Sequence, residues 1–278
     1  MTYSENDFLN YRYTRGIVRE VSEELTGALS EKGRSADISI EEARREHEQY
    51  IETLKSLGIE ITVLPADPAF PDGVFVEDTA VVLPGLAVIT RPGAETRAGE
   101  ADSVMAAISP MIDIDTRRMK SGGTVDGGDV LRLGKRYFFG LSSRTDDAGA
   151  KELIAIIEER GLTGETVEFA GALHLTTIIT PLSTDAVVGT KEILENPAFE
   201  KIEGLRKIVV PEKERPAGNV LVANGKILVP AGFPETSGRI SEAGFKVIEV
   251  DNYEFMKADG GLTCRSVLWW GDGWTIIL

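Results

Sequence analysis

The chain repeats one pattern of elements five times, and this repeat is the strongest constraint on its fold. Each repeat contains two apolar runs joined by a turn whose residues tolerate positive φ, as β-hairpins require. The expected hairpins lie at residues 74–92, 127–145, 173–189, 218–234 and 264–278. Their turns fall at residues 84–85, 134–135, 183–185, 224–225 and 271–273.

Ahead of each hairpin the sequence predicts a helix followed by a further strand. Ser39 and Glu42 form a capping-box pattern that opens a helix to residue 57, and Gly58 ends this helix before the strand IEITVLP. Further helices are expected near residues 97–108, 146–160, 191–203 and 235–243. Because no proline-rich or serine-rich linker interrupts the series, we expect a single domain over residues 1–278.

A unit of helix, strand and hairpin cannot cover its own apolar face, so five such units favour an α/β protein closed into a ring. One residue near the start of each hairpin marks the repeat, in the order Asp78, Asp126, His174, Asn219 and Cys264. The gaps between them are 48, 48, 45 and 45 residues. If the units are related by rotation, these five positions converge on one axis. They include the only cysteine and one of the two histidines.

Composition excludes several classes of protein and site. A single cysteine forbids an intrachain disulfide, and with only two histidines a zinc site is disfavoured, so we expect no metal. The formal net charge of −15 argues against nucleic-acid binding and suits a cationic small molecule. No stretch approaches 18 apolar residues and the N-terminus lacks a signal-peptide pattern, so we expect a cytoplasmic protein without a membrane segment.

Cys264 and His174 each have a structural and a catalytic interpretation. A free cysteine is usually a small buried hydrophobe, and a histidine ahead of a β-branched run is usually a core residue. Their equivalent positions in the repeat favour a nucleophile and an acid–base partner instead. His47, within EEARREHEQY, is expected to be a solvated helix residue.

Acidic residues cluster where hairpins begin. Asp126, in GGTVDGGDVL, either caps its turn or orients a histidine, and GGDV lacks the pattern of a phosphate loop. Glu77 and Asp78 enter a hydrophobic strand, where a carboxylate needs a partner that a bound cation would supply. Asp72, in FPDG, is either a turn residue or part of the same pocket.

Two arginines lie near the ends of the first two hairpins: Arg97 shortly after the first, and Arg144 at the end of the second. Arginines at strand ends usually reach solvent. Two of them near one pocket can instead clamp a carboxylate with bidentate hydrogen bonds.

Six motifs together resemble the dimethylarginine dimethylaminohydrolase (dimethylargininase) family of the guanidine-modifying, or amidinotransferase, superfamily. They are FVEDTAVV, ITRPGA, DGGDVL, FFGLSSRT, LHL and DGGLTC, in this order, and the resemblance runs from about residue 10 to residue 268. It implies the five-bladed α/β propeller called the pentein fold. It also implies hydrolysis of Nω-methylated arginines to citrulline and methylamine or dimethylamine, with no cofactor.

By motif position, the resemblance implies Cys264 as nucleophile, His174 as proton donor and Asp126 as the group that orients His174. The reaction would pass through a covalent S-alkylthiouronium on the cysteine. The implied substrate-binding residues are Asp72, Glu77 and Asp78 for the guanidinium, Arg97 and Arg144 for the α-carboxylate, Leu29 in a lid loop, and the backbone of Ala258.

Alternatives of the same fold stay open at this stage. An arginine deiminase has an acidic residue two positions after the catalytic histidine, where this chain has Thr176, and an amidinotransferase is usually longer. Other guanidine hydrolases fit equally well. A ribosome-binding pentein factor lacks the catalytic residues present here. We expect a small guanidino amino acid as partner, no nucleic acid or membrane, and a monomer or homodimer.

Overall fold

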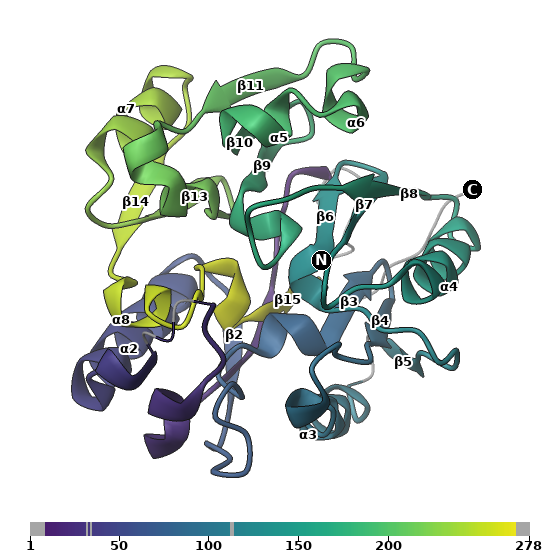
Figure 1. Cartoon of the computed structure of the whole chain (residues 1–278), viewed down its shortest axis with the longest axis vertical. Helices are drawn as coiled ribbons and strands as arrows, with labels where there is room; N and C mark the ends of the chain where they lie inside the picture. The colour runs from purple at the N-terminus through teal and green to yellow at the C-terminus, as the bar shows by residue number, and fades with distance from the viewer. Residues whose placement is uncertain (1–8, 32, 34, 112–113, 271–278) are drawn as a thin grey trace.

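Five three-stranded sheets stand around a central axis, with the helices mostly toward the outside (Figure 1). The computed structural model describes residues 9–31, 33, 35–111 and 114–270. In each sheet an antiparallel pair of strands is joined by a third strand that runs parallel to the middle one. This arrangement confirms the predicted five-bladed α/β propeller.

One strand of each antiparallel pair, the strand at the edge of its sheet, lies nearest the axis, and we call these five the inner strands. They are β3 (Ala80–Leu83), β6 (Val130–Leu133), β9 (Ile179–Ser183), β12 (Leu221–Ala223) and β15 (Val267–Trp269). The middle strands are β4 (Leu86–Ile89), β7 (Arg136–Leu141), β10 (Ala186–Gly189), β13 (Lys226–Pro230) and β1 (Arg15–Arg19). The outer strands are β5 (Asp115–Arg118), β8 (Thr163–Glu168), β11 (Arg206–Val209), β14 (Val247–Val250) and β2 (Glu60–Leu64).

The helices range from a single turn to the 17 residues of α2. They are α2 (Ile40–Ser56), α3 (Glu100–Ile108), α4 (Asp147–Glu158), α5 (Lys191–Leu194), α6 (Pro197–Glu200), α7 (Pro234–Glu242) and α8 (Tyr253–Met256). The single helix expected over residues 191–203 is two short helices, because Asn196 caps a new helix that starts at Pro197. Among the described residues, no helix is long and apolar enough to cross a membrane.

The two ends of the chain build one blade together. β15 does not form the hairpin expected over residues 264–278. Its antiparallel partner is β1, a strand that the sequence pattern did not predict. Residues 271–278 of the expected hairpin lie outside the described residues. Pairing of β1 with both β15 and β2 closes the ring of blades.

The repeat also begins at a different point from the one expected. We grouped each helix and strand with the hairpin that follows, but β5 pairs in parallel with β4 of the preceding hairpin. The helix between them, α3, is the crossover that a parallel connection needs. Each blade is therefore a hairpin followed by its helix and outer strand, except the blade that the chain ends share.

The helix face that packs inward explains a wrong prediction for His47. The buried positions of α2, including His47, Tyr50 and Leu54, follow helical spacing. His47 is only 3% exposed and packs 5.9 Å from the ring of Phe255. Burial and the nearby Arg265 charge lower the pKa of His47 to about 3, so the ring is neutral.

A short 3₁₀ turn leads into every inner strand. These turns are η3 (Val76–Thr79), η5 (Gly127–Asp129), η6 (Leu175–Thr177), η7 (Glu212–Gly218) and η8 (Thr263–Arg265). The five residues that mark the repeat lie in these turns or at their ends.

Hydrogen bonds link four of the turns in sequence around the axis. The N–H of Gly128 donates to Asp78 Oδ1 at 3.0 Å, which joins η5 to η3. Thr176 Oγ1 donates to the carbonyl of Gly128 at 2.7 Å, which joins η6 to η5. Asn219 Nδ2 donates to the carbonyl of Thr176 at 2.9 Å, which joins η7 to η6.

Thr263 completes the circle from η7 back to η3. Its N–H donates to Asn219 Oδ1 at 3.1 Å, and its hydroxyl donates to Glu77 Oε2 at 2.7 Å. We call this closed set of bonds the hydrogen-bonded ring. It fixes the start of all five inner strands and therefore the positions of the side chains that meet at the axis.

The ring makes Asn219 a test of the fold. Asn219 is 1% exposed, and its amide bonds both Thr176 and Thr263. We expect Asn219→Ala to lower the free energy of unfolding by about 1–3 kcal/mol, because buried donors and acceptors lose their partners. Urea unfolding would measure it, with the exposed Thr184→Ala as control. Equal stability of the two variants would contradict a structural role for the ring.

Candidate active site

Cys264 lies in η8, where the last inner strand leaves the hydrogen-bonded ring. It is 7% exposed, and the N–H of Gly261 donates to its Sγ at 3.2 Å. Burial, followed by the charges of Glu77 and Asp78, raises the pKa of the thiol well above its ordinary value. The thiol is therefore protonated at neutral pH, and a cation placed beside it would favour the thiolate.

Two glycines allow the backbone to lie close to the side chains of His174 and Asn219. A Cβ at Gly128 would lie 2.7 Å from His174 Nδ1. A Cβ at Gly261 would lie 2.3 Å from the side chain of Asn219. Both distances are shorter than real Cβ contacts, so the turns before β6 and β15 need glycine at these positions.

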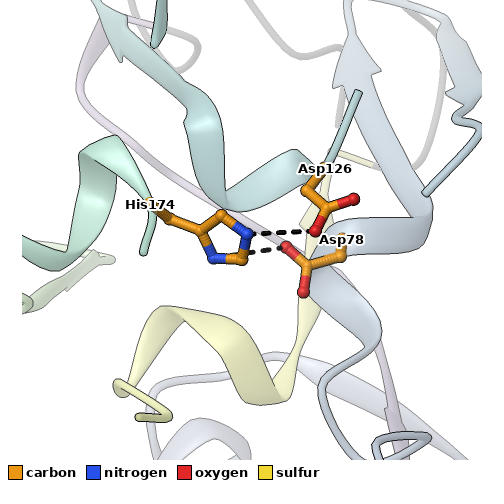
Figure 2. A group of neighbouring side chains, drawn as sticks. All are labelled: Asp78, Asp126 and His174. Atoms are coloured by element: carbon orange, nitrogen blue, oxygen red, sulfur yellow. Dashed lines mark hydrogen bonds and ion pairs between the residues drawn. The ribbon is translucent and has the colours of Figure 1, made fainter. Parts of the chain in front are cut away.

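His174 points toward two carboxylates, as Figure 2 shows. Its Nε2 lies 3.0 Å from Asp126 Oδ2, and its Nδ1 lies 3.9 Å from Asp78 Oδ1. Burial alone would lower the pKa of His174, but the charge of Asp78 and the hydrogen bond to Asp126 raise it from 6.5 to about 9. The imidazole is therefore protonated at neutral pH and can donate a proton.

Asp126 is held in place by the backbone around it. It is 0% exposed, its Oδ1 accepts from the N–H of Gly93 at 2.8 Å, and its own N–H donates to Thr145 Oγ1. Arg144, predicted to bind substrate, places Nη1 3.7 Å from Asp126 Oδ2. The geometry thus supports Asp126 as the residue that orients His174, and it places Arg144 at the same site.

Arg97 occupies a different position from the one its predicted role requires. It is 3% exposed, and its guanidinium pairs with Asp78 Oδ2 at 2.5 Å and with Glu100 Oε2 at 2.7 Å. A further N–H donates to the carbonyl of Phe75. The charges of Asp78 and Glu100 raise the pKa of Arg97 against the opposing effect of burial. To hold a substrate carboxylate, Arg97 would have to exchange one of these partners.

Two buried acids of the site were missed in the sequence. Glu100 stands three residues after Arg97, a spacing that brings the two side chains together at the start of a helix. Asp129 accepts from the N–H of Leu175 at 3.0 Å and from Ser142 Oγ at 2.6 Å, so it fixes the backbone next to His174. Burial raises the pKa of Asp129 to about 6. The second aspartate of DGGDV, Asp129, is the sequence feature from which this residue could have been identified.

Glu77 and Asp72 complete the acidic side of the site. Burial, followed by the charge of Asp78, raises the pKa of Glu77 to about 7. Asp72 is 6% exposed, and burial raises its pKa too. Its Oδ1 accepts from the N–H of Leu29 at 3.0 Å, which brings the predicted lid residue onto the acidic group.

The segment that follows Leu29 also bonds the loop before Cys264. Ser30 Oγ donates to the carbonyl of Lys257 at 3.0 Å, and the N–H of Glu31 donates to Asp259 Oδ2 at 2.7 Å. Ala258, between these two acceptors, is 5% exposed and packs in the same apolar cluster as Cys264. The structure therefore brings the predicted lid residue, the predicted backbone site and the predicted nucleophile to one place.

Within the described residues, the atoms of Asp78, Asp126 and His174 lie close enough to hold a metal ion, within 4.8 Å of one another. Each of these groups already has a hydrogen-bond partner suited to proton transfer or charge pairing. The expectation of no metal stays a prediction.

Comparison with known proteins gives a consistent result. A family model described as "N,N dimethylarginine dimethylhydrolase, eukaryotic" matches residues 22–216. The chain is 37% identical over 225 residues to the N(G),N(G)-dimethylarginine dimethylaminohydrolase of Pseudomonas aeruginosa, covering 81% of this chain and 87% of that one. It is 34% identical over 254 residues to the protein of the same name from Streptomyces coelicolor, covering 91% and 96%.

Solved structures agree with these relatives. A cysteine-to-serine mutant of the Pseudomonas aeruginosa enzyme, in complex with citrulline, matches with a TM-score of 0.88 and 34% identity, over 93% of this chain and 100% of that one. The N-terminal domain of a cyanobacterial arginine dihydrolase matches with a TM-score of 0.81 over 92% and 98%, but at 19% identity it supports the fold alone.

The charge on His174 gives a prediction for pH dependence. We expect one histidine to titrate near pH 9 and the other, His47, to stay neutral down to about pH 3. Because the folded pKa of His174 is raised, its stabilising contribution is complete below pH 6.5 and is lost as pH rises through about 9. Asp126→Asn should lower the pKa of His174.

NMR titration of the two imidazole rings in the unaltered protein and in Asp126→Asn would measure both effects. The variant His174→Ala assigns the signals. A His174 midpoint near 6.5 in the unaltered protein would contradict the electrostatic description of the site.

Proposed function

The chain belongs to the dimethylarginine dimethylaminohydrolase family, and on that basis we propose that it hydrolyses Nω-methylated arginines to citrulline with release of methylamine or dimethylamine. The observation that carries the proposal is the meeting of one thiol, one protonated histidine and several carboxylates at the axis. Such a set suits a cationic substrate whose central carbon needs a nucleophile and whose leaving group needs a proton.

In the first half of the reaction the substrate guanidinium would lie against Glu77, Asp78 and Asp72. Its positive charge offsets the burial and the carboxylates that keep the thiol of Cys264 protonated, so the thiol releases its proton to solvent as the substrate binds and becomes the thiolate. The sulfur attacks the guanidinium carbon and a C–S bond forms. His174 donates its proton to the methylated nitrogen, the C–N bond breaks, and the amine leaves a covalent S-alkylthiouronium.

In the second half a water molecule attacks the same carbon. His174, now neutral, takes a proton from that water as the C–O bond forms. The C–S bond then breaks, the electron pair returns to Cys264, the remaining hydroxyl proton passes to solvent, and citrulline is released. Asp126 keeps the imidazole in position for both transfers, and Asp78 supports its charged form.

The proposal favours methylated arginine over arginine. In the position where arginine deiminases carry a second acid, Thr176 is 5% exposed and its hydroxyl donates to the carbonyl of Gly128. Thr176 therefore contributes a bond to the hydrogen-bonded ring and supplies no carboxylate. Arg144 and the backbone near Leu29 and Ala258 would bind the amino-acid end, which favours an α-amino acid over other guanidines.

Several further expectations belong to this proposal. The chain would work as one domain, as a monomer or homodimer, without a cofactor, and in the cytoplasm. Its only required partner would be the small guanidino amino acid.

The substrate prediction is checked by citrulline release from asymmetric dimethylarginine, monomethylarginine and arginine side by side. We expect both methylated compounds to be turned over and arginine to be left nearly untouched. Release from arginine alone would indicate a deiminase. If none of the three compounds is turned over while Cys264 still alkylates readily, the substrate is another guanidine.

The mechanism is checked by Cys264→Ser and His174→Ala. Each should reduce turnover by about 10²-fold or more, because one removes the nucleophile and the other the proton donor. Circular dichroism and thermal unfolding would confirm that both variants fold. Protection of Cys264 from alkylation by substrate serves as a control for its position. Near-normal rates in either variant would refute the assigned roles.

A further inference from the structure

Asp129 is a buried acid beside the candidate active site to which the reaction described above gives no part. It is 0% exposed and ends η5, directly before inner strand β6. A carboxylate withdrawn from water lowers stability unless hydrogen bonds or a cation offset the lost hydration. The contacts of Asp129 therefore show what its burial achieves.

The first contact of Asp129 is with the segment that carries His174. Its Oδ1 accepts from the N–H of Leu175 at 3.0 Å, and Leu175 is the first residue of η6, directly after His174. An N–H at the start of such a turn has no partner within the turn, so the carboxylate satisfies it and fixes the backbone from which the imidazole projects. Burial lowers the pKa of His174, and the charge of Asp129 is one of those that raise it to about 9.

The second contact of Asp129 is with the turn that carries Arg144. Ser142, directly after β7, donates from Oγ to Asp129 Oδ2 at 2.6 Å. The same hydroxyl oxygen accepts from the N–H groups of Arg144 and Thr145, at 2.9 and 3.1 Å. The N–H of Ser142 donates to the carbonyl of Thr145 at 3.1 Å and closes the turn. The backbone of Arg144 is therefore held on the carboxylate through one hydroxyl group.

Thr145 extends the same group of contacts to Asp126. Its Oγ1 accepts from the N–H of Asp126 at 3.1 Å. Burial raises the pKa of Asp129 to about 6, while the charge of His174 and the hydroxyls of Ser142 and Thr145 act in the opposite direction. The carboxylate is therefore largely ionised at neutral pH, and its charge faces the imidazolium.

We propose that Asp129 is a positioning residue for the hydrolysis, which holds the proton donor His174 and the substrate-binding Arg144 in a fixed arrangement. The inference rests on the proposed function. A methylated arginine has to place its guanidinium near His174 and its α-carboxylate near Arg144 at the same time. One carboxylate bonds the segments that carry both side chains, so it fixes the distance that the substrate has to span. A displacement of ~1 Å between such groups is enough to lower a rate by about 10²-fold.

Two substitutions separate the two contacts. Asp129→Asn keeps the shape of the side chain but removes its charge and puts an N–H donor in place of one acceptor. Ser142→Ala disconnects only the turn of Arg144 and leaves the bond from Asp129 to Leu175 in place.

The matched control is Glu214→Gln in η7. Glu214 is 5% exposed and also accepts from backbone N–H groups and a hydroxyl, those of Glu235 and Thr236. Citrulline release from asymmetric dimethylarginine gives kcat and KM for each variant. NMR titration gives the pKa of His174, and urea unfolding gives the stability.

We expect Asp129→Asn to lower kcat and to raise KM by about tenfold each, because both contacts are disturbed. The pKa of His174 should fall below about 9 in this variant, although Asp78 and Asp126 remain. Ser142→Ala should raise KM by at least about threefold, with kcat and the pKa of His174 nearly unchanged. Glu214→Gln should lose stability without any of these changes.

Two results would overturn the proposal. One is an Asp129→Asn variant whose kcat, KM and His174 pKa match those of Glu214→Gln. The other is a Ser142→Ala variant whose KM is unchanged, or whose kcat falls as much as its KM rises, and this result decides even if Asp129→Asn does not fold. Failure of the proposed function would look different, because the unaltered chain would then release no citrulline from the methylated substrate.

Discussion

The closed circle of hydrogen bonds among the five 3₁₀ turns is the constraint on which the rest of the structure depends. Every blade contributes a turn to it, so no blade can shift without breaking a bond to its neighbour. Two members of this ring adjoin side chains of the site. Asp78 Oδ1 lies 3.9 Å from His174 Nδ1, and Thr263 immediately precedes Cys264. The bonds that close the propeller are therefore the same bonds that align the site.

Negative charge exceeds positive charge among the side chains that meet at the axis, and this surplus defines the site. Asp72, Glu77 and Asp78 meet there, and the nearest guanidinium, that of Arg97, is shared between Asp78 and Glu100. Burial, followed by this surplus of negative charge, keeps the thiol neutral, and the carboxylates keep the imidazole charged against the effect of burial. A cation bound beside these carboxylates would offset the surplus and favour the thiolate of Cys264.

The fold could be predicted from the sequence because hairpins repeat at visible, nearly constant spacing and bring the marked residues to one axis. The strand β1 could not, since its five residues carry no pattern that points to β15 at the other end of the chain. His47 was assigned to solvent because its neighbours in sequence are charged, yet Phe255 covers it. Glu100 and the paired state of Arg97 depend on burial, which local sequence does not reveal.

The shared blade has a consequence for biosynthesis. During translation β1 is made long before β15 and the turn that holds Cys264. Until then the first strand lacks one neighbour and the propeller stays open. A nascent chain therefore carries these acidic groups for most of its synthesis without Cys264 among them. Completion of the shared blade and arrival of Cys264 at the acidic groups coincide.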